Sequence, residues 1–405
     1  MRDFINNTLF LKKNKIELFK ALLYGSSIFY FCQPVYFWSD DTFKVIPALL
    51  IFGLSISNMN ARRSKIESFL LIFLTILLII SLNPGSKGID LNILRIVFRF
   101  LLIAIFILGN YKKLIYFKSF KYIYSFSLLI SIIYYLLVIG LNIDLAHTFI
   151  EPLNIGKNYN YSNYFFLVIP NTIDRLRFHG VFDEPGVVGT LSGLILALEN
   201  FNLKNKINIP ILIGGILSFS FFFYLIAFIY LIIILDKTKK IILIITIVIF
   251  YQITFNNTIF NTFIWSRFEI IDNNIIGDNR EELAFKDYYN SFIKTDNYQW
   301  GLGNIASSKL GYNVSSYKQI IVNWGIFGFS LILIFYSILI FGLVSNIKKS
   351  FAILILFLGL IYQRPGVFNP VYFFIIISGL YQIKMDEANL KLKKDTDKFL
   401  DISSG

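Results

Sequence analysis

Residues 122–141 read YIYSFSLLISIIYYLLVIGL, twenty consecutive positions without a charged side chain. A helix rises about 1.5 Å per residue, so this stretch is long enough to cross the roughly 30 Å hydrocarbon core of a bilayer. Further apolar stretches lie near 16–38, 43–58, 66–82, 91–109, 186–201, 207–217, 218–235, 241–255, 319–345, 351–363 and 369–383. The pattern predicts an all-α polytopic membrane protein, with about 12 transmembrane helices in a single integral membrane domain, 1–405.

Composition supports this class and excludes several others. The chain is 56% hydrophobic and only 16% charged, with a mean hydropathy of +0.64. The single cysteine, Cys32, leaves no internal disulfide and no thiolate cluster, and two histidines argue against a His-built metal site. The basic residues 1–15 precede a span too long for a cleaved signal peptide. We therefore expect no metal, no cofactor and no nucleic-acid partner, since topology explains the net charge of +13.

Lysine clusters set the predicted orientation, because cytoplasmic loops carry the positive excess. Each cluster follows an even number of crossings: 12–15, 62–65, 112–121, 204–206, 237–240, 348–349 and the tail. This places both termini in the cytoplasm. Lysines flank residues 207–235 on both sides, so that stretch needs an even number of crossings. Two short helices breaking near Ser218–Ser220, or a re-entrant hairpin, satisfy the rule; eleven crossings is the fallback.

Three segments lie outside the predicted spans. Residues 142–185 and 256–318 form two long loops on the predicted non-cytoplasmic face, and 384–405 is expected to be a mobile cytoplasmic tail. Within the second loop, four aromatic residues follow one helix face: Phe285, Tyr288, Tyr289 and Phe292. This face predicts either a helix lying on the membrane surface or a platform on which sugars stack.

Arginine is distributed unlike lysine. Of 28 lysines, 21 fall on the predicted cytoplasmic side, whereas seven of ten arginines fall away from it. Lysine is a hydrated point charge, but arginine is a planar fork that matches phosphate oxygens. The pattern indicates that lysine orients the protein and that arginine contributes to its chemistry.

The densest group of reactive residues is DRLRFHGVFDEPGVVG, 174–189. Pro185 can open a helix, which places Asp183 and Glu184 beside its positive end. Ordinary helix capping explains these carboxylates as well as catalysis does. Elsewhere, Arg95 and Arg99 share a helix face within one span, which predicts that Arg95 faces the bundle interior. Arg364 in QRPGVFNP, 363–370, is explained equally by snorkelling.

These motifs, in this order, resemble one family. RFHGVFDEPGVVGT, SRFE (266–269), WGLGN (300–304), NWGIFGF (323–329) and QRPGVFNPVYF look like the Wzy-type O-antigen polymerases, within the O-antigen polymerase and ligase group. The resemblance implies an integral inner-membrane glycosyltransferase of the GT-C type, active in lipopolysaccharide biosynthesis. It would transfer a growing glycan from undecaprenyl diphosphate onto a lipid-linked repeat unit at the periplasmic face, with a chain-length regulator protein as partner.

The residues suggest how such a transfer proceeds. A glycosyl diphosphate needs its leaving-group charge neutralised, and arginine forks supply this without a metal. The candidates for binding the diphosphate are Arg177, Arg175, Arg267, Arg280, Arg364 and Arg95. A base must accept the proton of the acceptor hydroxyl, and the candidates are Asp183, Glu184 and His179. An O-antigen ligase and a transporter or flippase of lipid-linked oligosaccharide are the alternative functions.

Overall fold

The computed structural model describes residues 15–37, 49–51, 53–54, 65–81, 97–98, 100–104, 107, 112–151, 159–265, 270–271, 274–275, 283–303, 316–363 and 369–403. These residues are mostly helical, as the composition predicts. Among the described residues, two helices are long and apolar enough to cross a membrane, Leu114–Gly140 and Tyr317–Leu343. Shorter apolar helices accompany them, so the structure is compatible with a membrane protein. The number of 12 crossings stays a prediction.

The principal helices begin near the lysine clusters or near Pro and Asn residues. Their bounds are α2 Lys15–Phe31, α4 Lys65–Ser81, α6 Lys112–Tyr135, α7 Pro185–Leu198, α8 Asn208–Leu217, α9 Phe221–Ile234, α10 Lys237–Thr254, α11 Thr258–Phe263, α12 Leu283–Phe292, α13 Asn297–Trp300, α15 Tyr317–Leu343, α16 Ile347–Gln363 and α17 Pro370–Ser403. Short helical turns are η1 Val35–Phe37, η3 Leu136–Gly140 and η4 Ile173–Leu176.

A small sheet corrects the all-α prediction between α6 and α7. Strands β1 Thr148–Ile150, β2 Tyr161–Asn163 and β3 Val168–Pro170 pair antiparallel in the order β1-β2-β3. Two shorter strands, β4 Ile270–Ile271 and β5 Asn274–Ile275, pair in the second long segment. The strands have two or three residues each, too few for a clear alternating pattern, so pairing between segments rather than local periodicity forms them.

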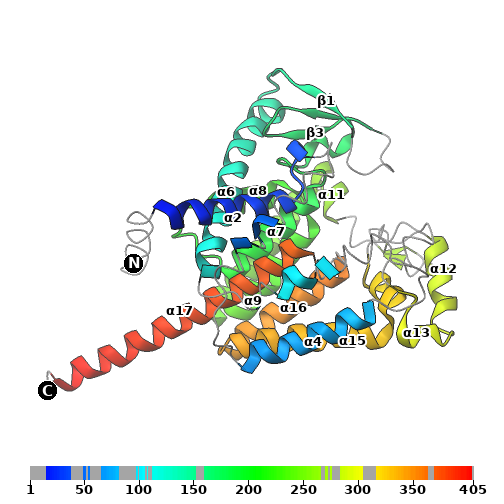
Figure 1. Ribbon diagram of the computed structural model, residues 1–405. Coiled ribbons are helices and arrows are strands. Elements are labelled where there is room, and N and C mark those ends of the chain that lie inside the picture. Colours follow the sequence, from blue (N-terminus) through cyan, green and yellow to red (C-terminus); the bar gives the residue numbers. More distant parts are fainter. Residues whose placement is uncertain are drawn as a thin grey trace.

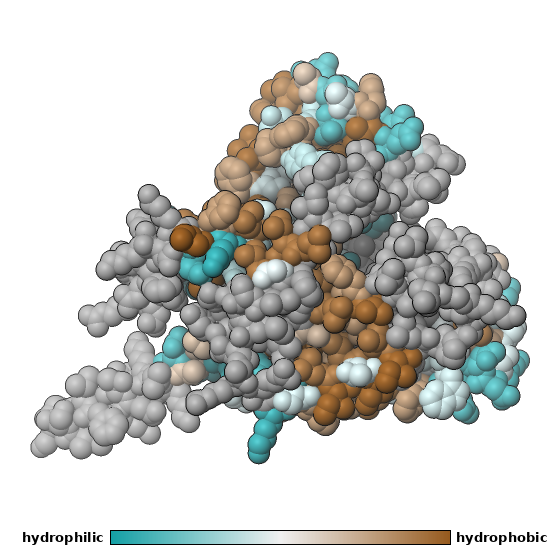
Figure 2. Space-filling model, in the orientation of Figure 1, coloured by the Kyte–Doolittle hydropathy of each residue, from teal (hydrophilic) through white to brown (hydrophobic). Residues whose placement is uncertain are grey.

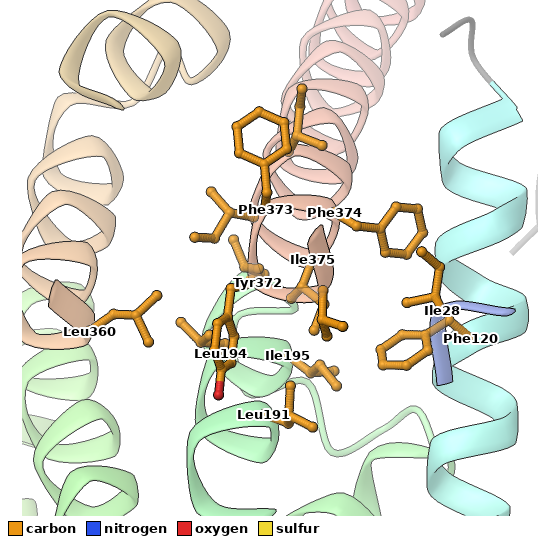
Figure 3. Close-up of a cluster of buried hydrophobic side chains, with 14 of the residues drawn as sticks. Ile28, Phe120, Leu191, Leu194, Ile195, Leu360, Tyr372, Phe373, Phe374 and Ile375 are labelled. Carbon is orange, nitrogen blue, oxygen red and sulfur yellow. The ribbon is translucent and has the colours of Figure 1, made fainter. Parts of the chain in front are cut away.

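The core is built around the first half of α17. Its side chains pack between α6 on one side and α7 and α16 on the other, as Figure 3 shows. Gly379 allows α17 to approach α7 closely, since a Cβ there would lie 2.5 Å from Leu198 Cδ1. The residues drawn are nearly all branched or aromatic and buried, which is the close packing expected of a protein interior.

The helix ends that bear lysine meet at one end of the bundle. There the Tyr381 hydroxyl donates to Glu67 at 2.8 Å, and Lys121 forms an ion pair with Glu199. The start of α2 and the end of α17 lie on this side, at the left of Figure 1, whereas the sheet lies at the top and α12 and α13 at the right. The predicted orientation in a membrane stays a prediction.

The charged C-terminal stretch is helical rather than an irregular tail. α17 continues from Pro370 to Ser403 without interruption. Its side chains beyond Gly379 are mostly strong helix formers, and Gln382 donates to Asp386 one turn later at 2.9 Å. Glu387 also accepts the backbone N–H groups of Ser345 and Asn346, which ties this part of α17 to the turn before α16.

Candidate functional site at the break between α8 and α9

The apolar stretch 207–235 is a helical hairpin whose break falls where the sequence predicts it. α8 ends at Leu217, Phe219 has a φ of +45°, and α9 begins at Phe221. Ser218 and Ser220 lie against Gly189, near the start of α7. α8 has ten residues and therefore spans about 15 Å, roughly half a hydrocarbon core. The short α8 favours the re-entrant alternative.

The direction of each helix follows from its contacts with α7. Asn208, at the start of α8, donates to Glu199 at the end of α7 at 3.1 Å, so α8 runs antiparallel to α7. The α9 residue Ile226 packs on Gly193, and Tyr230 donates to Asn200 at 2.8 Å. α9 thus runs back alongside α7, and the chain reverses direction at the break.

The last carbonyl groups of α8 are satisfied by residues from the approach to α7. Phe178 N–H donates to Leu217 O at 2.9 Å. The Arg177 guanidinium donates through Nε to Ser218 O at 3.2 Å and through NH2 to Phe219 O at 3.4 Å. Helix C-termini leave such acceptors open, and cations are favoured beside them. Arg177 and Phe178 therefore hold the end of α8.

Local side chains satisfy the carbonyl groups one step earlier in α8. The Tyr224 hydroxyl donates to Ile216 O at 2.8 Å, and Ser218 Oγ donates to Gly215 O at 2.6 Å. Five consecutive carbonyl groups, 215–219, thus have named donors. Non-helical backbone at membrane depth is tolerated only where it is buried in this way.

The Arg177 side chain is largely buried by the protein itself. Its NH1 lies 3.7 Å from Asp174 Oδ1, and its guanidinium carbon lies 5.3 Å from the centre of the Phe263 ring. The side chain retains 14% exposure. In this conformation Arg177 acts as a packing and capping arginine, which is the structural alternative to a phosphate contact.

Pro185 begins α7, as the sequence predicts, and the two carboxylates precede it. Glu184 occupies the N-cap position in extended conformation, but its side chain makes no capping hydrogen bond. The Tyr161 hydroxyl, from β2, donates to the Asp183 backbone carbonyl at 2.8 Å. Burial, the hydrogen bond to Tyr159 and the nearby negative charge of Asp183 raise the pKa of Tyr161, so it stays a neutral donor. Both carboxylates are half-buried.

The remaining described candidates differ in access to solvent. His179 is buried, with its ring 6.1 Å from Tyr161, whereas Arg175 is exposed on η4. Arg177, His179, Asp183 and Glu184 thus lie within the protein along the segment that leads into α7. Arg175 lies at the surface of the same segment. Arg95, Arg267, Arg280 and Arg364 lie outside the described residues, as does Arg99.

Two partners of this site were not predicted from the sequence. Tyr161 comes from a three-residue strand, and the α8 carbonyl groups lie more than 35 residues from Arg177 along the chain. The sequence signal that could have indicated Tyr161 is the high aromatic content of residues 142–185. Among the described residues, no group of three or more His, Cys, Asp or Glu side chains is placed to hold a metal ion.

The aromatic face of α12 packs inside the protein. Phe285 and Phe292 are buried against Ile321 and Val322 of α15. For these two residues, neither of the predicted roles applies: the rings contact the protein rather than the membrane surface or a sugar. The helix itself is confirmed.

No protein family, curated protein or solved structure matches this sequence.

Proposed function

We propose that this chain is a metal-independent membrane glycosyltransferase that polymerises lipid-linked oligosaccharide repeats. The donor is a glycan on undecaprenyl diphosphate, the acceptor is a second lipid-linked repeat unit, and a chain-length regulator is a partner. The single observation that supports this best is the composition of residues 174–184, the segment that leads into α7. It places two arginines and two adjacent carboxylates beside a buried helix break, at the end of α7 opposite to Glu199 and its lysine partner.

The proposed chemistry assigns a different task to each charge. The acceptor hydroxyl attacks the anomeric carbon, the bond from that carbon to the diphosphate breaks, and a carboxylate takes the hydroxyl proton. Asp183 or Glu184 is this base, because both are half-buried whereas His179 is fully buried. Arg175, exposed on η4, meets the diphosphate first. Arg177 fixes the hairpin that borders the approach.

The decisive experiment incubates the purified protein with a lipid-linked repeat unit in the absence of metal. A ladder of products supports polymerisation. Transfer only to a lipid A core acceptor would instead identify a ligase, and no transfer would favour transport.

Variants refine the assignment of the base. Asp183→Asn and Glu184→Gln are compared with Glu151→Gln, an exposed carboxylate beside β1 in the same segment. Loss of a general base lowers the rate by roughly 100-fold or more. Only one of the first two variants should reach that loss, and Glu151→Gln should retain full activity.

A further inference from the structure

α15 and α16 present one apolar face to the surroundings. The exposed large side chains on α15 are two helical turns apart on a single stripe: Phe327, Ile334 and Phe341. The corresponding stripe on α16 consists of Ile347, Phe351, Ile355, Leu358 and Tyr362. Figure 2 shows hydrophobic surface, in brown, in the lower part of the view, where Figure 1 places α4 and α15. An apolar face of this extent needs an apolar partner.

The two ends of this face differ in chemistry. At one end, where the Phe341 and Phe351 rings lie 5.4 Å apart, α16 begins with Lys348 and Lys349. At the other end, the exposed Tyr362 stacks on Tyr317 with ring centres 6.2 Å apart. The helix between them covers about 22 Å. The pair Lys348 and Lys349 at one boundary and tyrosine rings at the other fit a bilayer-spanning surface, which has its lysine excess on one side and aromatic rings at its boundaries. Lys318, beside Tyr317, lies 5.2 Å from the centre of the Tyr289 ring.

Trp300 extends the face beyond the helices. It ends α13, is 57% exposed, and its ring centre lies 5.2 Å from that of Phe327, the first member of the α15 stripe. Leu302, two residues later, is also exposed. Trp300 therefore lies on the apolar side of α15 rather than among the buried residues. A tryptophan favours the membrane boundary because its ring is apolar and its indole N–H needs a polar neighbour.

We infer that Trp300 anchors residues 297–303 in the outer interfacial layer of the bilayer, between phospholipid headgroups and acyl chains. This inference rests on the membrane-spanning part of the proposed function and not on its chemistry. The backbone holds the anchor in place, because Leu302 N–H donates to Val322 O and Gly303 N–H to Asn323 O, both at 2.9 Å. A sugar-stacking role would require the same ring to face water, and the test separates the two.

The test is depth-dependent quenching of tryptophan fluorescence. The chain has four tryptophans, so Trp38→Phe, Trp265→Phe and Trp324→Phe together leave Trp300 as the reporter. The protein is reconstituted into phosphatidylcholine–phosphatidylglycerol vesicles whose acyl chains are brominated near the carbonyl or near the methyl end. The matched control keeps Trp324 alone, because that residue is adjacent in the fold but only 7% exposed. A reference adds Ile334→Trp to a chain in which all four tryptophans are Phe.

We expect Trp300 to be quenched at least twofold more by the shallow bromines than by the deep ones, and the Trp324 control to be quenched weakly by both. Ile334→Trp should respond most to the deep bromines. Quenching of Trp300 by aqueous iodide, without quenching by the brominated lipids, would overturn the inference. If Ile334→Trp is still quenched by the lipids in that case, the membrane-spanning role of the α15 face stands. If the triple variant does not fold, Trp300→Phe in the native chain must remove the shallow-quenched part of the emission; retention of that part would overturn the inference equally.

Discussion

The backbones of Gly301 and Gly325 are in close contact where residues 301–303, which follow α13, cross α15. A Cβ on Gly301 would lie 2.5 Å from Gly325 N, and a Cβ on Gly325 would lie 2.2 Å from Gln299 O. Both residues have positive φ, +78° and +68°. Gly325 interrupts the helical conformation of α15, and the carbonyl groups of Val322 and Asn323 accept hydrogen bonds from residues 302 and 303. The motifs WGLGN and NWGIFGF therefore contact each other through these two glycines, in what we call the glycine contact.

Substitution at the glycine contact should lower the free energy of unfolding. Gly325→Ala adds left-handed strain of about 1–2 kcal/mol and a backbone clash that costs a similar amount. We expect the free energy of unfolding to fall by roughly 2–4 kcal/mol, measured by denaturation in detergent. Gly303→Ala is the control, since Gly303 has a φ of +99° but nothing within 4 Å of a Cβ. Equal losses in both variants would mean that the close approach contributes nothing.

The buried ion pair between Lys121 and Glu199 should depend on both partners. Their side chains are 3% and 10% exposed, and Glu199 also accepts from Asn208. Lys121→Met leaves an uncompensated carboxylate and should lower the free energy of unfolding by about 3–5 kcal/mol. Adding Glu199→Met should recover most of that loss.

The control for this pair is Lys239→Met. Its partner Asp236 lies 3.8 Å away, and both side chains are largely exposed, so the change should stay within about 0.5 kcal/mol. A double variant as unstable as Lys121→Met would show that packing, rather than charge, determines the loss.

Arg175 and Arg177 should respond differently to lysine. Arg177→Lys loses the fork that reaches Ser218 O and Phe219 O, so the unfolding free energy should fall by about 1.5–3 kcal/mol and activity with it. Arg175→Lys should lower polymerisation roughly 10- to 100-fold while the melting temperature stays unchanged. Parallel assays of product ladders and thermal unfolding test this. An unchanged melting temperature in Arg177→Lys, combined with lost activity, would return the phosphate contact to Arg177.

The proposed transfer should not need a divalent cation. EDTA should leave the product ladder unchanged, because arginine rather than a metal neutralises the diphosphate. Abolition of activity by EDTA, with rescue by Mg²⁺ or Mn²⁺, would contradict the mechanism. The same buffer without EDTA provides the baseline rate.

Topology can be tested by labelling single cysteines in a Cys32→Ser background with an impermeant maleimide. Lys204→Cys and Lys239→Cys should react only after the cells are opened, whereas Lys294→Cys should react in intact cells. All three positions are exposed, so differences in reactivity report the side of the membrane. Labelling of Lys239→Cys from outside would break the predicted orientation.

Sequence patterns predicted the features that neighbouring residues determine, namely where helices begin, break and present an apolar face. Lysines flanking an apolar run of 29 residues predicted the break at Ser218–Ser220, and Pro185 predicted the start of α7. The face of α12 was also evident from its spacing. Its packing partner was not, because Ile321 and Val322 come from a distant helix and resemble any other apolar pair.

The role of Arg177 shows the same limit more sharply. Its charge and its place in the motif predicted an ionic contact, but the acceptors are backbone carbonyl groups, which no side-chain pattern reveals. The sheet was missed for a related reason: strands of three residues depend on pairing between segments. The continuous α17 was missed because charged composition was taken to indicate a mobile tail, although the same residues favour helix.

The capped break also constrains how the protein is assembled. Residues 207–235 are apolar enough to enter the membrane as they are synthesised, but their exposed carbonyl groups at 217–219 would then face hydrocarbon without donors. Those donors reside on Arg177 and Phe178, which are made earlier. Without contact to residues 177 and 178 these carbonyl groups would lack those donors, so the folding of the hairpin is coupled to the docking of the 174–184 segment.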